Sequence, residues 1–247
     1  GEKEFKKPGL FLSFDDGLRE IHSIVEPILS QYGVPATFFV NPNFVDNEDM
    51  LYRCKVALIA DELKEDRDLG AVINTIEEIA GHRISSSEAL KFIWNLKQED
   101  HKLIEKLASL LGIDFNQYLQ ENRPYMTLEE LAELSEKGYV IGAHSVDHPL
   151  FSEISMDKQI DQVEQSVEWV QKHFPNQPKV FAFPFTNYGA DNGLYDYFIN
   201  PENPRLDFMF GTAGHKPTDS SRFLHRIPME TSLMDAKKRL KGEFFYY

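Results

Sequence analysis

Two histidines and two adjacent aspartates are the residues of this chain whose types and spacing could do chemistry. His144 and His148 lie in the segment His-Ser-Val-Asp-His, and three intervening residues can bring both imidazoles to one metal ion. The chain has eight histidines, so this spacing can also arise by chance, and two unrelated surface histidines are the alternative. The position of the pair directly after a predicted strand favours the metal.

Asp15 and Asp16 are neighbours, and two adjacent carboxylates repel each other unless a cation or a proton absorbs the charge. A turn followed by a helix N-cap is the alternative interpretation, because aspartate and glycine both favour turns and Gly17 follows the pair. At the end of a strand, however, one carboxylate can bind a metal while the other faces a substrate.

Asp16, His144 and His148 together offer one oxygen and two nitrogen ligands. Catalytic zinc usually takes three ligands from the protein and keeps a further position open for water. Such a metal lowers the pKa of its water and polarises a carbonyl group. Asp15 would then be the general base that positions and deprotonates this water. The predicted chemistry is therefore hydrolysis of an amide or an ester, with a divalent metal, most simply zinc, as the cofactor.

The elements that must position these residues alternate between strands and helices. Short apolar runs predict strands at residues 9–14, 36–40, 139–143, 179–183, 207–210 and 223–227. Apolar residues at helical spacing predict helices at residues 18–32 and 155–174, and Thr127 with Glu130 forms a capping box that opens another helix. This alternation indicates parallel βαβ units. The candidate residues follow strand ends, where parallel α/β barrels build their active sites.

Residues 50–122 interrupt this alternation with helical patterns and no clear strand. Within them, residues 87–97 and 101–112 repeat apolar side chains at helical spacing. No linker rich in glycine, proline or serine separates the segment from its neighbours. We therefore predict one domain over residues 1–247, with a helical insertion at about 50–122. An independent helical domain is the alternative.

The composition is that of a globular chain, because 42% of its residues are hydrophobic, which is enough for a sizeable core. The net charge of -14 repels phosphate backbones, so nucleic acid is not an expected partner. Cys54 is the only cysteine, so no intramolecular disulfide can form, which fits a reducing compartment and does not exclude an oxidising one. No apolar run is long enough for a transmembrane segment and no signal peptide is visible, so the cytoplasm is the favoured location.

The motifs resemble those of the polysaccharide deacetylases, also called the NodB-homology family or carbohydrate esterase family 4. Residues 13–17 (Ser-Phe-Asp-Asp-Gly) resemble the first motif of the family, and residues 141–149 resemble the second, which supplies two histidine ligands. Residues 181–185 (Phe-Ala-Phe-Pro-Phe) resemble the third, which forms one wall of the groove. The resemblance covers about residues 8–48 and 125–230, and it implies a distorted (β/α) barrel of about seven strands.

The resemblance also implies roles for individual residues. Asp15 would be the catalytic base, and Asp16 and the two histidines would bind zinc or another divalent metal. The backbone N–H after Pro184, at Phe185, would help to hold the oxyanion. The substrate would be an N-acetylated carbohydrate, as a polymer, an oligosaccharide or a lipid-linked sugar, which loses an N-acetyl or O-acetyl group.

One departure from the family pattern concerns an arginine that orients the base. The third motif often has this arginine two residues before its proline, and Ala182 stands at that place here. We predict that Arg226, on a late strand, replaces it from another direction, at the groove that also holds Pro184 and Phe185.

A second departure concerns the catalytic acid. The last motif of the family ends in a histidine that protonates the leaving amine, and His225 is the candidate for it, with His215 as the second choice. A strand histidine packed against a neighbour is the alternative interpretation of His225. The Asp-x-x-Asp-Trp motif of the family is not recognisable in this chain.

Two other functions stay open on these residues. The same centre could serve an amidase for a small non-sugar amide. The fold could also be a non-catalytic carbohydrate-binding module, which the missing arginine at Ala182 would favour. The intact acid pair argues against the module, because a degenerate site has little need to keep two carboxylates that repel each other.

Overall fold

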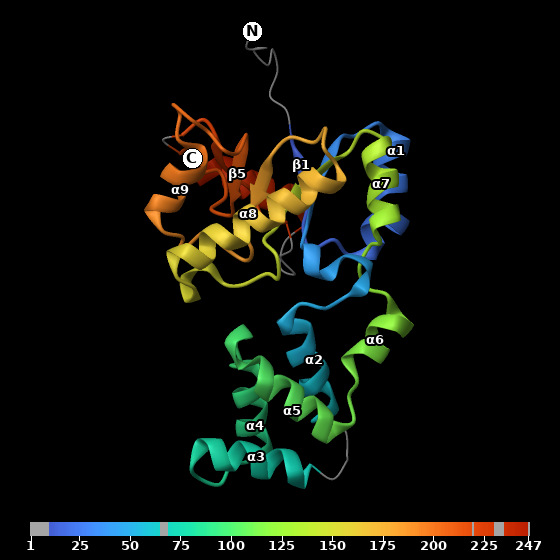
Figure 1. Cartoon of the computed structure of the whole chain (residues 1–247), viewed down its shortest axis with the longest axis vertical. Helices are drawn as coiled ribbons and strands as arrows, with labels where there is room; N and C mark the ends of the chain where they lie inside the picture. Colours follow the sequence, from blue (N-terminus) through green and yellow to red (C-terminus); the bar gives the residue numbers. More distant parts are fainter. Residues whose placement is uncertain (1–9, 65–68, 219, 230–234, 247) are drawn as a thin grey trace. The chain divides into compact units, whose positions relative to one another are not determined.

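The chain divides into two compact units, which are described separately below (Figure 1). The structure, a computed structural model, describes four stretches of the chain: residues 10–64, 69–218, 220–229 and 235–246. The larger unit comprises residues 1–46 and 124–247, and the smaller unit comprises residues 47–123. None of the helices within the described stretches combines the length and the apolar character that a membrane span requires.

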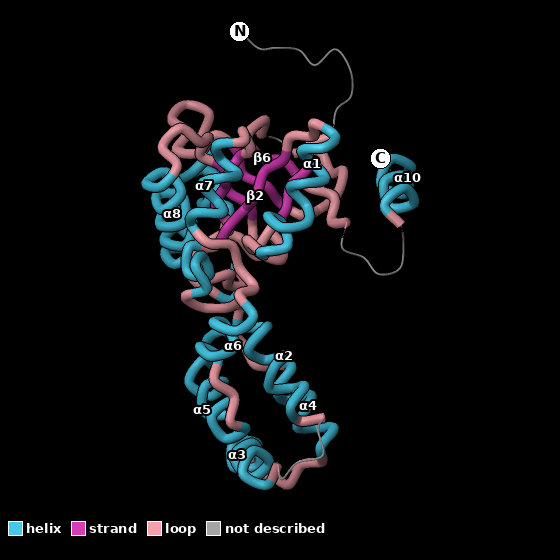
Figure 2. The backbone as a smooth tube through the Cα atoms, turned by 90° about the vertical axis from the view of Figure 1, so that its right-hand side faces the viewer, coloured by secondary structure: helices cyan, strands magenta, loops and turns pink. Residues whose placement is uncertain are grey.

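A six-stranded parallel sheet forms the centre of the larger unit, and Figure 2 shows its strands surrounded by helices. The strands lie in chain order: β1 (Leu12–Phe14), β2 (Ala36–Val40), β3 (Val140–Ala143), β4 (Val180–Ala182), β5 (Phe208–Gly211) and β6 (Phe223–His225). Each strand pairs in parallel with the next. The predicted distorted (β/α) barrel is confirmed, with six strands among the described residues in place of about seven.

Side chains alternate between an inner and an outer face of this curved sheet. The inner face holds a small buried cluster of Phe39, Val180, Ala182 and Phe210. Gly142 lies beside Phe39 in the register of β2 and β3. A Cβ atom at this glycine would lie 2.6 Å from the Phe39 ring, so any larger residue at position 142 would clash with the inner cluster.

Helices cover the outer face of the sheet: α1 (Glu26–Tyr32), α7 (Leu128–Glu136), α8 (Met156–His173) and α9 (Asn192–Ile199). Their apolar side chains and those of the strands form one core, to which α8 contributes Val163, Val167 and Val170. This spacing places the three valines on one face of the helix. Each buried valine stabilises the fold by about 1.5 to 3 kcal/mol relative to an exposed one.

The helix expected at residues 18–32 begins differently from the sequence prediction. A π-helical turn, η1 (Ile21–Val25), precedes α1. A π turn carries more residues than an α turn, so it rotates the following residues relative to a continuous α-helix. As a result Leu29 is buried, whereas Ile28 is 52% exposed. The capping box that opens α7 is confirmed, because Thr127 and Glu130 exchange hydrogen bonds of 3.1 and 2.9 Å.

The smaller unit is helical, and its described residues contain no strand. Its helices are α2 (Tyr52–Glu62), α3 (Gly70–Ala80), α4 (Ser86–Trp94), α5 (His101–Leu111) and α6 (Phe115–Asn122). They bury apolar side chains that include Val56, Ile59, Ile76, Ile93, Ile104 and Leu107. The remaining described helical segments of the chain are η2 (Pro42–Asn47), η3 (Gln98–Asp100), η4 (Phe151–Glu153) and α10 (Ala236–Tyr246).

Candidate metal centre and catalytic site

The turn after β1 carries the adjacent acids. Asp16 and Gly17 both have a φ of 68°, in the left-handed region. This conformation is unfavourable for aspartate, so the surrounding structure must hold it. The turn sends the two carboxylates to different partners: Asp15 contacts Arg226, and Asp16 contacts two histidines.

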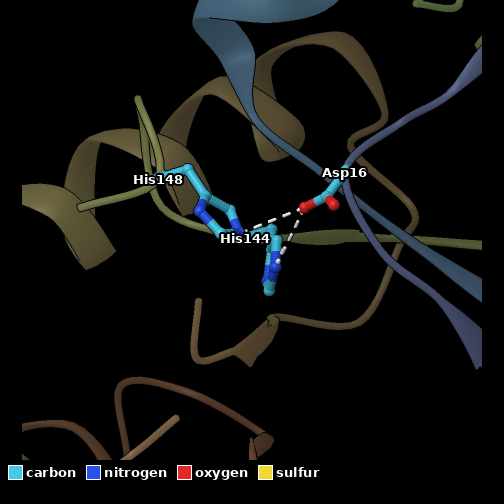
Figure 3. A group of neighbouring side chains, drawn as sticks. All are labelled: Asp16, His144 and His148. Atoms are coloured by element: carbon cyan, nitrogen blue, oxygen red, sulfur yellow. Dashed lines mark ion pairs between the residues drawn. The ribbon is translucent and has the colours of Figure 1, made fainter. Parts of the chain in front are cut away.

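Asp16, His144 and His148 meet at one point, as Figure 3 shows. Asp16 Oδ1 lies 3.4 Å from His144 Nε2 and 3.1 Å from His148 Nε2. One ligand atom from each residue lies within 4.8 Å of the others. The histidines are 1% and 3% exposed, which contradicts the interpretation of unrelated surface histidines. This set of donors fits a divalent metal with an open position.

The second ring nitrogen of His144 has a defined partner. Nδ1 lies 2.8 Å from the carbonyl oxygen of Ala182. A carbonyl oxygen only accepts, so Nδ1 carries a proton, and Nε2, on the side of Asp16, is the nitrogen that could bind a metal. Histidines that bind metals are usually oriented by a hydrogen bond of this kind. Ala182, which lacks the arginine side chain expected from the family, thus contributes through its backbone.

The pKa values of the three residues diverge. Burial raises the pKa of Asp16, but hydrogen bonds from His144 and His148 outweigh this effect and hold the pKa well below its usual range. Burial lowers the pKa of His144, but the carboxylates of Asp15 and Asp16 outweigh it and raise that pKa. Burial lowers the pKa of His148, and Asp16 offsets this only in part. An ionised Asp16 beside a neutral His148 suits a metal, because ligands must be deprotonated.

Arg226 holds Asp15 with two parallel hydrogen bonds. Its Nη1 donates to Oδ1 at 2.6 Å and its Nη2 donates to Oδ2 at 2.8 Å. Nη1 also donates to Ser13 Oγ at 3.0 Å, and the guanidinium lies over the Phe39 ring, 5.2 Å from its centroid. Since β1 and β6 are the two edge strands, this contact joins the edges of the described sheet. The structure therefore holds Arg226 against both carboxylate oxygens of Asp15.

His225 does not reach this cluster. It directly precedes Arg226, and neighbouring strand residues point to opposite faces. Its ring centroid lies 4.8 Å from that of Phe223, which packs against the outer core, and its Nδ1 accepts a backbone hydrogen bond of 3.2 Å. These surroundings match the alternative of a packed strand histidine. The second candidate, His215, lies in the loop after β5, where its backbone N–H donates to Glu243 of α10 at 3.1 Å.

The third motif lies against the histidine ligands. Pro184 and Phe185 follow β4, and Phe185 has a φ of 52°. Its ring contacts His148 edge to face, with the centroids 4.4 Å apart, and is 43% exposed. The motif thus forms a surface beside the cluster, as a groove wall would.

Three residues that hold the loop between the histidines carry no prediction from the sequence. Asn41, directly after β2, donates to the carbonyl oxygens of His144 and Ser145. Ser145 accepts a hydrogen bond within the loop, and Gln162 of α8 accepts one from Val146. The strand-end position of Asn41, shared with Asp15, could have indicated it. A polar residue on an amphipathic helix, such as Gln162, gives no comparable signal.

Comparison with known proteins identifies similar sequences and folds. A model of the family described as "Polysaccharide deacetylase" matches residues 2–84 and 101–194. The deacetylase PplD of Streptococcus pyogenes, solved in complex with acetate, is 16% identical with a TM-score of 0.53, over 94% of this chain and 68% of that chain. IcaB from Ammonifex degensii is 14% identical with a TM-score of 0.50, over 98% and 75%. No curated protein matches the chain. At these identities the structural similarity concerns the fold alone.

Proposed function

The chain belongs to the polysaccharide deacetylase family, and we propose that it is a metal-dependent hydrolase that removes N-acetyl, or O-acetyl, groups from an N-acetylated carbohydrate. Family membership makes the chain a carbohydrate deacetylase. The metal, the residue roles and the acetylated sugar are the proposed parts. The observation that supports them is that a cluster of metal ligands and a carboxylate held by an arginine lie together where the strands end.

Asp16, His144 and His148 would hold the metal, most simply zinc. The donor types fit, and Asp16 Oδ1 lies between two buried imidazoles, 3.4 Å from His144 Nε2 and 3.1 Å from His148 Nε2. When bound, the ion supplies a Lewis acid that polarises the acetyl carbonyl and lowers the pKa of a water. The remaining steps depend on side chains and backbone groups of this chain.

Asp15 would act as the general base. The guanidinium of Arg226 donates to both carboxylate oxygens and holds them in a fixed orientation. Asp15 Oδ2 also lies 3.6 Å from His144 Nε2, so the base and the ligand cluster face the same point. Taking the proton of the attacking water in this way is typically worth a factor of roughly 100 to 10,000 in rate.

Two further steps complete the reaction. The backbone N–H of Phe185 would donate to the acetyl oxygen as negative charge develops on it. The leaving amine must also gain a proton, a role predicted for His225. Because His225 points to the opposite face from Arg226, we assign this step to Asp15, which returns to the amine nitrogen the proton taken from water.

The arginine-held carboxylate also weighs against a non-catalytic module. A module that only binds carbohydrate needs no carboxylate held by an arginine beside a set of metal ligands. An amidase for a small amide would use the same groups, so substrate tests must separate it from a sugar deacetylase.

The test measures acetate released from a panel of N-acetylated oligosaccharides and polymers. The protein is first stripped with a chelator and then supplied with zinc or cobalt. We expect release only after metal is returned, and none from a His144→Ala/His148→Ala double variant. Release that persists in both the stripped protein and the double variant would overturn the metal role. Release from small non-sugar amides alone would move the assignment to an amidase.

A further inference from the structure

We propose that Gln162 and Asn41 are positioning residues that hold the loop from His144 to His148 in its metal-binding conformation from two sides. The proposal rests on the proposed function for its reference to the metal. The contacts that carry it are properties of the chain alone. Neither residue belongs to the set of ligands, and neither contacts the reacting atoms.

The loop needs such support because its backbone is strained. Ser145 has a φ of 65° and His148 has a φ of 62°, and neither residue is a glycine. Left-handed backbone at such residues persists only where the surrounding structure over-determines it. A relaxed loop would move the His148 ring away from Asp16, since one of the two strained residues is His148 itself and the other lies three residues before it.

Gln162 holds the loop from α8. Its Oε1 accepts from the backbone N–H of Val146 at 2.8 Å and from that of Asp147 at 3.4 Å. The next N–H along the chain, that of His148, donates to Ser145 Oγ at 3.1 Å. Three consecutive N–H groups are therefore paired with side-chain oxygens. Secondary structure does not fix this loop, so these side chains must do so.

Asn41 holds the other side of the loop. Its Nδ2 donates to the His144 carbonyl and, at 3.1 Å, to the Ser145 carbonyl. Asn41 is 1% exposed and directly follows β2, whose last residue Val40 accepts from the His144 N–H at 2.9 Å. The amide thus extends the pairing of β2 and β3 past the end of the strands. It joins the first ligand to the rigid sheet.

The consequence for function concerns metal affinity. Two ligands separated by three residues bind one ion only when the loop between them keeps a single shape. Losing partners that orient ligands typically costs about 10- to 100-fold in metal affinity. We therefore expect loss of the Gln162 acceptor to weaken metal binding without removing any ligand.

The experiment compares Gln162→Met with Gln162→Glu in the full chain. Methionine matches glutamine in length and in helix propensity but has no comparable acceptor, whereas glutamate keeps an acceptor oxygen. Gln165→Met is the matched control, because Gln165 is an exposed residue of the same helix. Zinc affinity is measured by competition with a chromophoric chelator. Hydrogen exchange at the amides of Val146 and Asp147 is measured on metal-free protein.

We expect Gln162→Met to bind zinc about 10- to 100-fold more weakly and to exchange the two amides faster. Gln162→Glu and Gln165→Met should stay close to wild type in both measurements. Wild-type zinc affinity and exchange rates in Gln162→Met would overturn the proposal. If the wild-type protein binds no zinc, the proposed function fails. Unchanged amide exchange in Gln162→Met would in that case also overturn the role of Gln162 in holding the loop.

A variant of Asn41, on the other side of the loop, provides an independent test. Asn41→Asp replaces the donor that faces two carbonyl oxygens with an acceptor of nearly the same shape. Zinc affinity should fall in this variant while the thermal unfolding of the metal-free protein still shows a folded chain. A folded Asn41→Asp protein with wild-type zinc affinity would contradict the role of Asn41. Should this variant not fold, the Gln162 series decides the proposal.

Discussion

At the level of residues, adjacent side chains in this site have separate surroundings. Asp15 lies in the fork of Arg226, whereas Asp16 lies between two imidazoles. The turn after β1 separates them, because Asp16 has left-handed backbone. His225 and Arg226 are divided in the same way by strand alternation. Neighbouring residues in this site therefore have different partners and can take different roles.

The sequence predicts part of this site well. Asp15, Asp16 and the two histidines follow predicted strand ends, and parallel strands bring such positions to one edge. The face on which His225 lies could not be predicted in this way. A shift of one residue in a short strand moves every side chain to the other face of the sheet. The sequence of β6 does not determine which of its side chains lie on which face.

The placement of His225 leads to a first prediction. His225→Gln should keep acetate release within about threefold of wild type, because the side chain packs on the outer face. Removal of a general acid would instead cost roughly 100- to 10,000-fold in rate. Steady-state kinetics on one N-acetylated oligosaccharide decide between the two. A loss in the larger range, with unchanged thermal stability, would restore His225 as the acid.

At the level of elements, α1 contains a buried charge that makes stability depend on pH. Glu26 accepts hydrogen bonds from Ser30 Oγ and from Lys137 Nζ, the latter at 2.9 Å. Burial raises the pKa of Glu26, but Ser30 and Lys137 outweigh this effect and lower the pKa below its usual 4.5. A carboxylate with a depressed pKa stabilises the fold above the pKa of the unfolded chain. This stabilisation is lost as the pH falls through the folded value.

The second prediction follows from the lowered pKa of Glu26. Glu26→Gln should be less stable than wild type at pH 7, because the buried pairing with Lys137 is lost. The difference in the free energy of unfolding should shrink as the pH falls below about 4.5, where the carboxylate of the unfolded chain becomes protonated, and on through the lower pKa of the folded one. Urea unfolding of both proteins at several pH values gives this difference. A difference that stays constant from pH 7 to pH 4 would contradict the assigned pairing.

Most elements could be predicted from apolar spacing, but η1 could not. The apolar residues from 18 to 32 fit a continuous α-helix, and the π turn at Ile21–Val25 has no signature in that pattern. Asn41 illustrates a similar limit at β2: its position after the strand is visible in the sequence, whereas its carbonyl partners are about 100 residues away and come together only in the fold.

At the level of the whole molecule, the chain leaves the larger unit after residue 46 and returns to it at residue 124, and these two points are adjacent. Asp46 donates through its backbone N–H to the Met126 carbonyl at 3.1 Å and accepts from the Leu128 N–H at 2.9 Å. The two chain ends of the larger unit are thus tied to each other without help from residues 47–123. The alternation of strands and helices breaks at about residues 50–122, and the smaller unit comprises residues 47–123. A break in pattern cannot tell an insertion from an independently folding unit.

The third prediction concerns that unit. Replacing residues 47–123 by a short glycine-rich linker should leave zinc affinity within about threefold of wild type, because all three ligands and their supports lie in the larger unit. We expect the preference among acetylated sugars to change, since the segment is inserted in the sequence between β2 and β3, and the loop after β3 carries two of the ligands. Chelator competition and the acetate panel measure the two effects. An unchanged preference across the panel would contradict a role in selecting substrates.

Parallel measurement of zinc affinity and acetate release in Asp15→Asn and Asp16→Asn tests the account most directly. Both variants are nearly isosteric with wild type. Asp16→Asn should lose zinc affinity, since charge and a ligand are lost together, and excess zinc should restore part of its activity. Asp15→Asn should bind zinc like wild type and stay slow at every zinc concentration, because the base is gone. Rescue of Asp15→Asn by zinc would mean that the two roles are exchanged, and full activity in both variants would contradict the deacetylase mechanism itself.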